Sequence, residues 1–162
     1  MTTSAICFVC LGNICRSPTA EGVFRAKLAQ AGLEREIEVD SAGTAAYHIG
    51  KPADARSREH AKLRGYELES VARQFSKEDF HRFDLILAMD TENLKNMQAM
   101  LEPDADAPRA QLKLFREYDP QAAPGESVPD PYHGGKQGFE EVLDICERTA
   151  EGLLVELQKE RK

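Results

Sequence analysis

Residues 5–18 read Ala5-Ile6-Cys7-Phe8-Val9-Cys10-Leu11-Gly12-Asn13-Ile14-Cys15-Arg16-Ser17-Pro18. The run from Ala5 to Val9 is short, apolar and rich in strand-forming residues, whereas the segment after it is polar and typical of a turn. A helical pattern begins at Pro18: Ser17 is suited to cap this helix, Pro18 to occupy its first position, and Gly32 to end it. The sequence therefore predicts a strand, a loop and a helix in immediate succession.

The loop places a thiol and a guanidinium six residues apart, at Cys10 and Arg16. If its backbone N–H groups point inward at the start of the helix, they form a cradle for a tetrahedral oxyanion. Gly12 and Asn13 are the residue types that most easily take the left-handed conformation which such a curl requires. Arg16 can clamp two oxygens of the anion, and the same positive surroundings stabilise a thiolate at Cys10. We expect this oxyanion to be a phosphate group, bound by Leu11, Gly12, Asn13, Ile14, Cys15, Arg16 and Ser17.

Strand and helix patterns alternate along the rest of the chain. The expected elements are a strand around Ile37 and Val39 with a turn at Asp40–Thr44, a helix from about Asp54 to Arg64, a short helical piece near Ser76–Phe80, a strand at Asp84–Met89, a helix at Thr91–Met100, a strand at Lys113–Phe115 and a long helix spanning Phe139–Leu157. This order predicts an α/β fold of three layers, with about four parallel strands in a doubly wound sheet and helices on both faces. The chain, residues 1–162, reads as one domain, and its ligand is expected beyond the carboxyl ends of the strands.

Composition and charge exclude several classes of protein. With 41% hydrophobic and 30% charged residues the chain is globular rather than disordered, and its net charge of −7 argues against binding to nucleic acid. The apolar stretches, among them Ala5–Leu11 and Leu85–Met89, are all too short to span a membrane, so we expect a soluble protein that is not exported. Three of the four cysteines lie within nine residues, which fits a reducing cytoplasm better than a secreted disulfide framework.

Residues 119–138 are rich in proline and glycine and are expected to form a long surface loop without regular structure. Loops of this length are uncommon unless they have a function. Asp130 lies in this loop, directly before Pro131 and Tyr132. Asp119, at the start of the same loop, is a second carboxylate that could act as an acid.

The sequence resembles the low-molecular-weight protein tyrosine phosphatases over nearly its whole length. Their C-x5-R-S signature is matched from Cys10 to Ser17, including the internal Gly-Asn. The other matching segments are Asp40-Ser41-Ala42-Gly43-Thr44, Ala72-Arg73-Gln74, Ala88-Met89-Asp90 followed by Asn93-Leu94, and Asp130-Pro131-Tyr132. A C-x5-R motif alone recurs on several folds, but all of these segments together, in this order, are specific to the low-molecular-weight phosphatases.

The resemblance implies a phosphatase with a cysteinyl-phosphate intermediate and no cofactor or metal. It makes Cys10 the nucleophile and Asp130 the general acid, which then serves as base when water hydrolyses the intermediate. It also implies that Ser17 donates a hydrogen bond to the Cys10 sulfur, and that Asn13 and Ser41 hold the loop in its strained shape. Phosphotyrosine proteins are the expected substrates of a monomeric enzyme, with inorganic phosphate or vanadate as inhibitors.

The walls of the substrate pocket are expected to come from Ile14, Tyr47, Tyr132 and His133. Two positions depart from the family pattern. His133 stands where many relatives carry a second tyrosine, and this affects substrate preference. Ser70 stands where many carry a histidine in the network behind the phosphate loop, which leaves that network softer but functional.

The remaining cysteines and histidines have simpler interpretations. In a strand, three steps of about 3.3 Å place the Cα atoms of Cys7 and Cys10 roughly 10 Å apart, beyond the limit of about 7 Å for a disulfide, so Cys7 is expected to pack in the core. Cys15 lies across the curled loop and is either a reversible disulfide partner of Cys10 or a loop residue without a redox role. The histidines show no metal-ligand spacing and are expected to lie on the solvated surface: His48, His60, His81 and His133.

Three alternative functions remain. A thioredoxin-coupled arsenate reductase of this fold needs further cysteines downstream, and the chain has none between Arg16 and Ile145, with Cys146 on the apolar stripe of the last helix. A protein-arginine phosphatase resembles this sequence but carries threonine where Ile14 stands, so Ile14 favours an aryl phosphate. A non-catalytic module that binds phosphotyrosine would keep its function without the Cys10 thiol.

Overall fold

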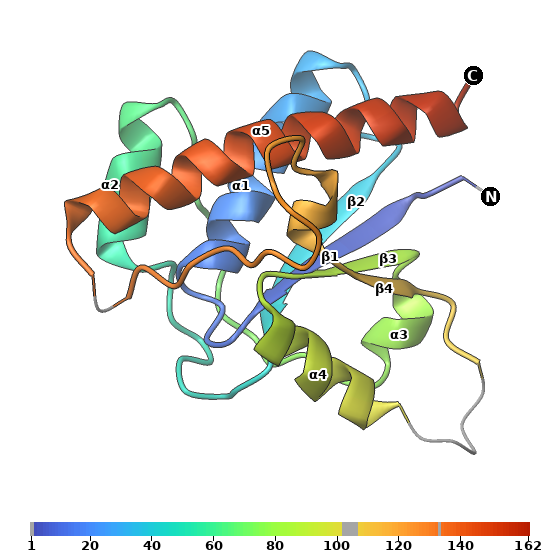
Figure 1. Ribbon diagram of the computed structural model, residues 1–162, viewed down its shortest axis with the longest axis horizontal. Helices are drawn as coiled ribbons and strands as arrows, with labels where there is room; N and C mark the ends of the chain where they lie inside the picture. The colour runs from blue at the N-terminus through green and yellow to red at the C-terminus, as the bar shows by residue number, and fades with distance from the viewer. Residues whose placement is uncertain (1, 102–106, 133) are drawn as a thin grey trace.

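The computed structural model describes residues 2–101, 107–132 and 134–162. Within these ranges, four parallel strands form one sheet in the order β2-β1-β3-β4 (Figure 1). The strands are β1 (Ala5–Cys10), β2 (Glu38–Gly43), β3 (Leu85–Ala88) and β4 (Gln111–Leu114). The helices are α1 (Arg16–Gln30), α2 (Ala55–Leu63), α3 (Asp79–Arg82), α4 (Thr91–Met100) and α5 (Lys136–Glu160), with a 3-10 turn, η1, at Phe115–Tyr118.

The side chains of β1 alternate between the two faces of the sheet, and each face is covered by a layer of helices. Ile6, Phe8 and Cys10 point to one face and pack with α1 and α5, whereas Cys7 and Val9 point to the other. That second face is covered by α3 and α4, as the lower half of Figure 1 shows. All six residues of β1 are buried, which is typical of a central parallel strand. The expected α/β architecture with helices on both faces is confirmed.

The predicted turn at residues 40–44 is wrong, because β2 continues through Gly43. Parallel pairing with β1 runs from Ala5 opposite Glu38 to Cys10 opposite Gly43. Turn-forming residues are kept in the strand here because each gains a ladder partner on β1. The strand therefore ends beside the loop that follows Cys10.

The first helix begins earlier than expected. Arg16 is its first residue, so Ser17 lies within the first turn and does not cap the helix, and Pro18 is the third residue rather than the first. Gly32 follows the helix with a φ of 72°, as its role at the C-terminus requires. The shift occurs because the Ser17 hydroxyl is directed to the loop, where it contacts Cys10 instead of a backbone amide.

Other boundaries move by a few residues. The short helix is α3 at Asp79–Arg82 rather than Ser76–Phe80, the fourth strand is Gln111–Leu114 rather than Lys113–Phe115, and Phe115 begins the 3-10 turn. The last helix starts at Lys136, so the last residues of the expected loop are helical, and it ends at Glu160. In the described part of the chain, no helix combines the length and the apolar character needed to cross a bilayer.

Candidate active site

The loop between β1 and α1 curls around the sulfur of Cys10. The backbone N–H of Asn13 lies 3.2 Å from Cys10 Sγ, and the Ser17 Oγ lies 3.0 Å from it. Cys10 is only 3% exposed, so its sulfur lies at the floor of the loop rather than on the surface. This arrangement brings donors to a thiolate from the backbone and from α1.

Asn13 holds the loop in its curled form. Its φ of 57° is in the left-handed region, and its side chain ties three segments together. The amide Nδ2 donates to Ser17 Oγ at 2.8 Å and to Ser41 Oγ at 2.9 Å, while Oδ1 accepts from the N–H of Arg73 at 3.0 Å. Asn13 is 1% exposed, so each of these bonds also satisfies a buried polar group.

Behind Asn13, the network continues into α1. Ser41 Oγ donates to Glu21 Oε1 at 2.6 Å, and Arg25 Nε donates to Glu21 Oε2 at 2.9 Å. Glu21 is 6% exposed, so the arginine balances a buried carboxylate. Ser70 lines a surface hollow beside Glu21, and the charge in this network is carried by the Glu21–Arg25 pair.

The end of β2 supports the loop from the side. Thr44 N–H donates to the Cys10 carbonyl and Ala45 N–H to the Leu11 carbonyl, both at 2.9 Å. Gly43 allows this approach, because a Cβ there would lie 2.8 Å from the Leu11 carbonyl oxygen and 3.1 Å from the Asn13 nitrogen. The close approach of the loop thus requires a residue without a side chain at position 43 of β2.

Arg16 is buried at the start of α1 and is held from two sides. Its Nη1 donates to Asp90 Oδ2 at 2.6 Å and to the Val128 carbonyl at 3.0 Å. Burial alone lowers the pKa of this guanidinium, but the negative charges of Cys10, Asp90 and Asp130 outweigh it and raise the pKa above its usual value. Arg16 therefore stays charged and oriented, with Nη2 turned toward Asp130 at 3.7 Å.

Asp130 is the most exposed of these groups, with 46% of its side chain accessible. The Tyr132 N–H donates to its Oδ1 at 3.0 Å, which leaves Oδ2 facing Arg16. Val128, two residues earlier, is anchored by donating its N–H to the Met89 carbonyl at 2.7 Å. The carboxyl group is thus presented on a loop that is fixed just upstream of it.

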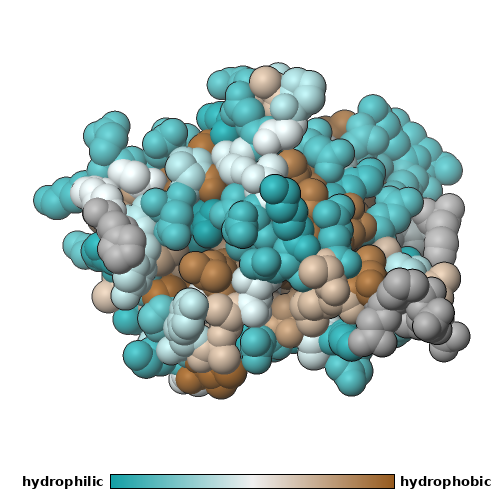
Figure 2. Space-filling view, turned by 60° about the horizontal axis from the view of Figure 1, so that its bottom comes forward, coloured by the Kyte–Doolittle hydropathy of each residue, from teal (hydrophilic) through white to brown (hydrophobic). Residues whose placement is uncertain are grey.

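These groups meet in one cavity of about 200 Å³, lined by Cys10, Leu11, Gly12, Ile14, Cys15, Arg16, Tyr47, His48, Asp130 and Tyr132. Two of the lining residues are exposed hydrophobic side chains, Leu11 (40% exposed) and Tyr47 (73%). The loop after β2 lies along the lower edge of Figure 1, and this edge comes forward in Figure 2, where brown and tan side chains gather among hydrophilic ones. The cavity thus has a charged floor and an apolar mouth.

The expectation that His48 lies on the solvated surface is wrong, because its side chain forms a wall of this cavity. It is half-buried, its ring lies 6.1 Å from that of Tyr132, and its Cδ2 would be 2.9 Å from a Cβ placed at Gly12. Its place in a loop without periodic pattern gave no signal. His133, expected as a further wall, lies outside the described residues.

The other sequence candidates lie elsewhere or play structural parts. Asp119 is 5% exposed and bound by Arg116 and Arg148, so it does not reach the cavity. His60 is not solvated surface, because it is half-buried, contacts Glu140 at 2.5 Å and stacks on Phe139. His81 is exposed, as expected.

The four cysteines are buried, and no disulfide joins them. Cys7 packs in the core below the sheet, and burial raises the pKa of its thiol. Cys146 lies on the buried stripe of α5, where burial likewise raises the pKa. These two thiols are inert by environment, so the chemistry of the loop falls to Cys10 and Cys15.

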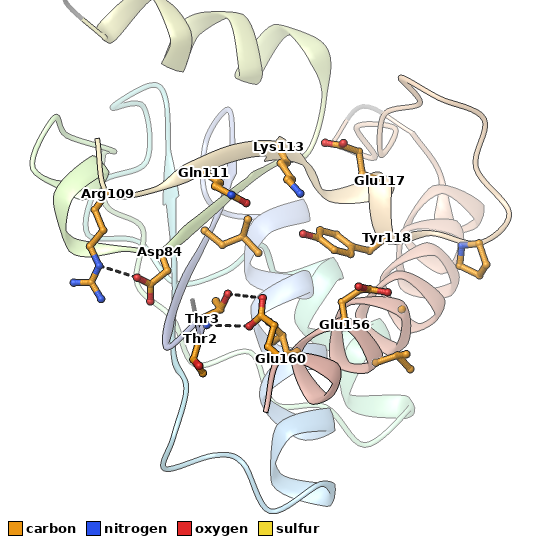
Figure 3. A pocket seen from close by; sticks show the side chains of 15 residues that line it. Thr2, Thr3, Asp84, Arg109, Gln111, Lys113, Glu117, Tyr118, Glu156 and Glu160 are labelled. Carbon is orange, nitrogen blue, oxygen red and sulfur yellow. Dashed lines mark hydrogen bonds and ion pairs between the residues drawn. The ribbon is translucent and has the colours of Figure 1, made fainter. Parts of the chain in front are cut away.

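A larger cavity of about 570 Å³ lies at the opposite ends of β3 and β4, against the end of α5 (Figure 3). Two of its charged groups form an ion pair, Asp84 with Arg109 at 2.7 Å, and Glu160 accepts from Thr3 at 2.9 and 3.1 Å. Lys113 lies 5.8 Å from the ring centre of Tyr118. No cysteine or histidine lines it, so nucleophilic chemistry belongs to the smaller cavity. Among the described residues, no group of three or more histidine, cysteine, aspartate and glutamate side chains is placed to hold a metal ion.

Residues 5–162 match the family model described as low molecular weight phosphotyrosine protein phosphatase. The chain belongs to this family. It is 45% identical to a low molecular weight protein-tyrosine-phosphatase of Streptomyces coelicolor, over 98% of this chain and 96% of the relative.

Solved structures agree with this membership. A protein tyrosine phosphatase from Entamoeba histolytica, with Hepes in its active site, superposes with a TM-score of 0.90 at 36% identity, covering 99% of this chain and all of the other. A Drosophila arginine phosphatase superposes at 0.87 and 30% identity, over 93% and 96%. The low molecular weight phosphatase family is a family of hydrolases, and the recognition made from the Cys10–Ser17 signature is confirmed.

Proposed function

We propose that this protein hydrolyses phosphotyrosine in proteins, and small aryl phosphates, through a cysteinyl-phosphate intermediate. In the first step the Cys10 thiolate attacks phosphorus, a P–S bond forms and the bond to the phenolic oxygen breaks. Asp130 gives its proton to that oxygen. Arg16 and the amides of residues 11–17 stabilise the charge on the three remaining oxygens.

In the second step a water molecule attacks phosphorus and the P–S bond breaks. Asp130, now ionised, takes the proton from the water. The departing thiolate is stabilised by Ser17, whose Oγ lies 3.0 Å from Cys10 Sγ, and by the Asn13 N–H at 3.2 Å. The products are inorganic phosphate and the restored enzyme.

The observation that carries the proposal is the meeting of Cys10, Arg16 and Asp130 in one small cavity. The sulfur lies at the floor, beneath a curled loop whose Asn13 is strained at a φ of 57°. Arg16 is locked by Asp90 and Val128, so its geometry is set before the substrate arrives. Such preorganised charge at a buried sulfur suits phosphoryl transfer.

The walls favour an aryl group over a shorter alkyl phosphate. Tyr47, His48 and Tyr132 offer ring surfaces, and the Tyr47 and His48 centroids are 6.4 Å apart. A phosphoserine side chain is too short to place its phosphate at the floor while its backbone stays at the mouth. Phosphotyrosine bridges that depth.

Phosphoarginine is the alternative substrate, because an arginine phosphatase has the same fold. The side chain of Ile14 presents only hydrocarbon to the cavity, next to Cys15 and Phe139 in one apolar cluster. A flat aromatic ring packs well there, whereas a guanidinium gains no polar partner from it. Peptides carrying either group should be turned over with a clear preference for phosphotyrosine.

We further propose that the enzyme acts as a monomer in the cytoplasm and is inhibited by phosphate and vanadate. Three cysteines within nine residues fit a reducing compartment better than a secreted disulfide framework. Both anions fit the tetrahedral or trigonal geometry that the loop amides and Arg16 would bind. The acidic net charge of −7 supports local capture of a single phosphoryl group rather than of a polyphosphate chain.

Cys10→Ser tests the proposal. We expect hydrolysis of an aryl phosphate, which vanadate inhibits competitively in the unchanged enzyme, to fall more than about 1,000-fold. Binding of inorganic phosphate, followed by calorimetry, should persist because Arg16 and the amides remain. Cys146→Ala removes a buried thiol remote from the cavity and should keep the turnover number. Turnover retained by Cys10→Ser would assign the attack to a different nucleophile, and phosphate binding without turnover in the unchanged protein would make it a binding module.

A further inference from the structure

Asp130 must be held over the phosphate loop, although the segment that carries it is neither strand nor helix. Upstream, Val128 is fixed to Met89 and Arg16. Downstream, the chain passes through Pro131 and Tyr132 before α5 begins at Lys136. The contact between Asp130 and Arg16 is 3.7 Å long, so it does not fix the carboxyl by itself.

Arg56, in the first turn of α2, contacts the downstream side. Its Nη2 donates to the Tyr132 carbonyl at 3.0 Å. The guanidinium carbon lies 5.4 Å from the Tyr132 ring centre and 4.8 Å from that of Phe139. The His60 ring also stacks on Phe139, at 5.6 Å with 8° between the rings. Arg56 thus joins Tyr132 to the first turn of α5, beside which α2 lies in Figure 1.

Asp54 orients Arg56 and connects it to the phosphate loop. The two carboxylate oxygens accept from Arg56 Nε and Nη2, each at 3.1 Å, in a bidentate pair. The Asp54 N–H donates to the Ile14 carbonyl at 2.7 Å, and its carboxylate also caps α2. A continuous path therefore runs from the loop that holds the sulfur to the segment that holds the acid.

We propose that Arg56 is a positioning residue, which holds the Asp130–Tyr132 segment over the phosphate loop so that the carboxyl reaches the leaving oxygen. This inference rests on the proposed phosphatase function. Arg56 does not line the cavity and touches no atom of the expected substrate. It acts through the Tyr132 carbonyl and ring, next to the residue that protonates the phenol.

The role predicts a dependence on the leaving group. Arg56→Gln removes the bidentate pair and the stacked plane but leaves the Asp54 cap and its bond to Ile14. For phosphotyrosine, whose phenol has a pKa near 10, kcat/KM should fall about tenfold, part of the roughly 10²–10⁴ that acid catalysis contributes. For dinitrophenyl phosphate, which leaves without protonation, kcat/KM should change less than about twofold.

Two further comparisons separate positioning from a structural or binding role. In an Asp130→Asn background, Arg56→Gln should cause no additional loss, because the group it positions is already absent. Arg56→Lys, which keeps the charge but not the plane, should recover little activity. Arg58→Gln removes another arginine of α2, whose Nε donates to the nearby Ala53 carbonyl at 2.9 Å, and should leave kcat/KM unchanged for both substrates.

The inference is overturned if Arg56→Gln lowers kcat/KM equally for all leaving groups, or if its effect adds to that of Asp130→Asn. An equal rise in KM and in the inhibition constant of phosphate would make Arg56 a binding cation instead. Thermal unfolding confirms that each variant is folded at the assay temperature, and an unfolded Arg56→Gln is replaced by Arg56→Lys in the same comparisons. If the unchanged protein hydrolyses no aryl phosphate, the proposed function fails, and this inference fails with it.

Discussion

Two thiols of one loop differ in chemical character. Cys10 is surrounded by donors at its sulfur, whereas Cys15 packs among Ile14, Ala72 and Phe139. Burial is the main cause that raises the pKa of Cys15 to about 12, although a hydrogen bond with Ser57 opposes the shift. At neutral pH the Cys15 thiol is therefore protonated and does not attack phosphorus, even though it lines the same cavity.

We predict that Cys15 becomes a resolving thiol only after Cys10 is oxidised. Peroxide converts the Cys10 thiolate to sulfenic acid, and the Cys15 thiolate then displaces hydroxide to form a disulfide. Because the pKa of Cys15 lies near 12, its thiolate fraction, and hence the rate of closure, should rise about tenfold per pH unit between pH 7 and 9. Mass spectrometry of the disulfide against time measures this rate.

In Cys15→Ser, the same treatment should drive Cys10 to its sulfinic acid, and activity should not return with dithiothreitol. Cys146→Ser leaves both loop thiols in place and should recover fully. Full recovery by Cys15→Ser would assign Cys15 no redox role, the second interpretation that the sequence allows.

Single residues divide into those with a sequence signal and those without one. Cys10, Arg16 and Asp130 were identified by spacing and family pattern, and the structure brings them to one cavity. His48 and Arg56 were not, because each acts through a neighbour that is distant in sequence, Tyr132 in both cases. Contacts between irregular segments have no periodicity, so residue types alone do not predict them.

At the scale of elements, β2 and the phosphate loop form one unit. Gly43 ends the strand where the loop comes closest, and a Cβ there meets backbone atoms of Leu11 and Asn13 rather than a mobile side chain. This is the physical reason why a strand carries residues that look like a turn. The sequence pattern reports local preference, while pairing with β1 and contact with the loop decide the outcome.

Gly43→Ala should therefore damage the site as well as the fold. We expect the loop to shift by a few tenths of an ångström, the inhibition constant of phosphate to rise several-fold, and stability to fall by about 1–3 kcal/mol. Gly22→Ala is the control, since its Cβ would meet Leu68 Cδ2 at 2.4 Å and the Glu67 carbonyl oxygen at 3.2 Å, neither of which belongs to a residue that lines the cavity. This control should lower the melting temperature without weakening the binding of phosphate. Equal phosphate affinity in Gly43→Ala and the unchanged protein would contradict the role given to Gly43.

At the scale of the molecule, the order of the elements was the most predictable property. Long apolar stripes in α5 and the buried run in β3 produced recognisable patterns, and each strand–helix alternation was placed correctly. Boundaries moved at β2, α3 and β4 as well as at α1 and α5, and the two long helices are the ones whose moved ends lie at the site: Ser17 contacts the sulfur, and α5 begins directly after the acid-bearing segment. At these two helix ends, contacts within the site set the boundary in place of local sequence preference.

Asp119 shows how the whole molecule supports the acid-bearing loop. It accepts from Arg116 in η1 at 2.9 Å and from Arg148 in α5 at 2.8 Å, and so ties the start of the loop to the last helix. Burial on its own raises the pKa of Asp119, but the bonds from Arg148, the Gln121 amide and Arg116 outweigh it and hold the pKa below its usual range. A carboxylate with a depressed pKa stabilises the folded state above its unfolded pKa and loses that contribution as pH falls through the folded value.

We predict that Asp119→Asn lowers stability by roughly 3 kcal/mol at pH 7, because two arginines lose their partner. In urea unfolding at successive pH values, the difference from the unchanged protein should be largest at neutral pH and shrink as the pH falls through the depressed pKa. The variant's kcat/KM for aryl phosphates, measured where it is fully folded, should stay within about twofold, since Asp119 does not line the cavity. A leaving-group dependence like that expected of Asp130→Asn would instead make Asp119 the proton donor, and the 5% exposure that hides its carboxylate would then have to be relieved by opening of the loop during turnover.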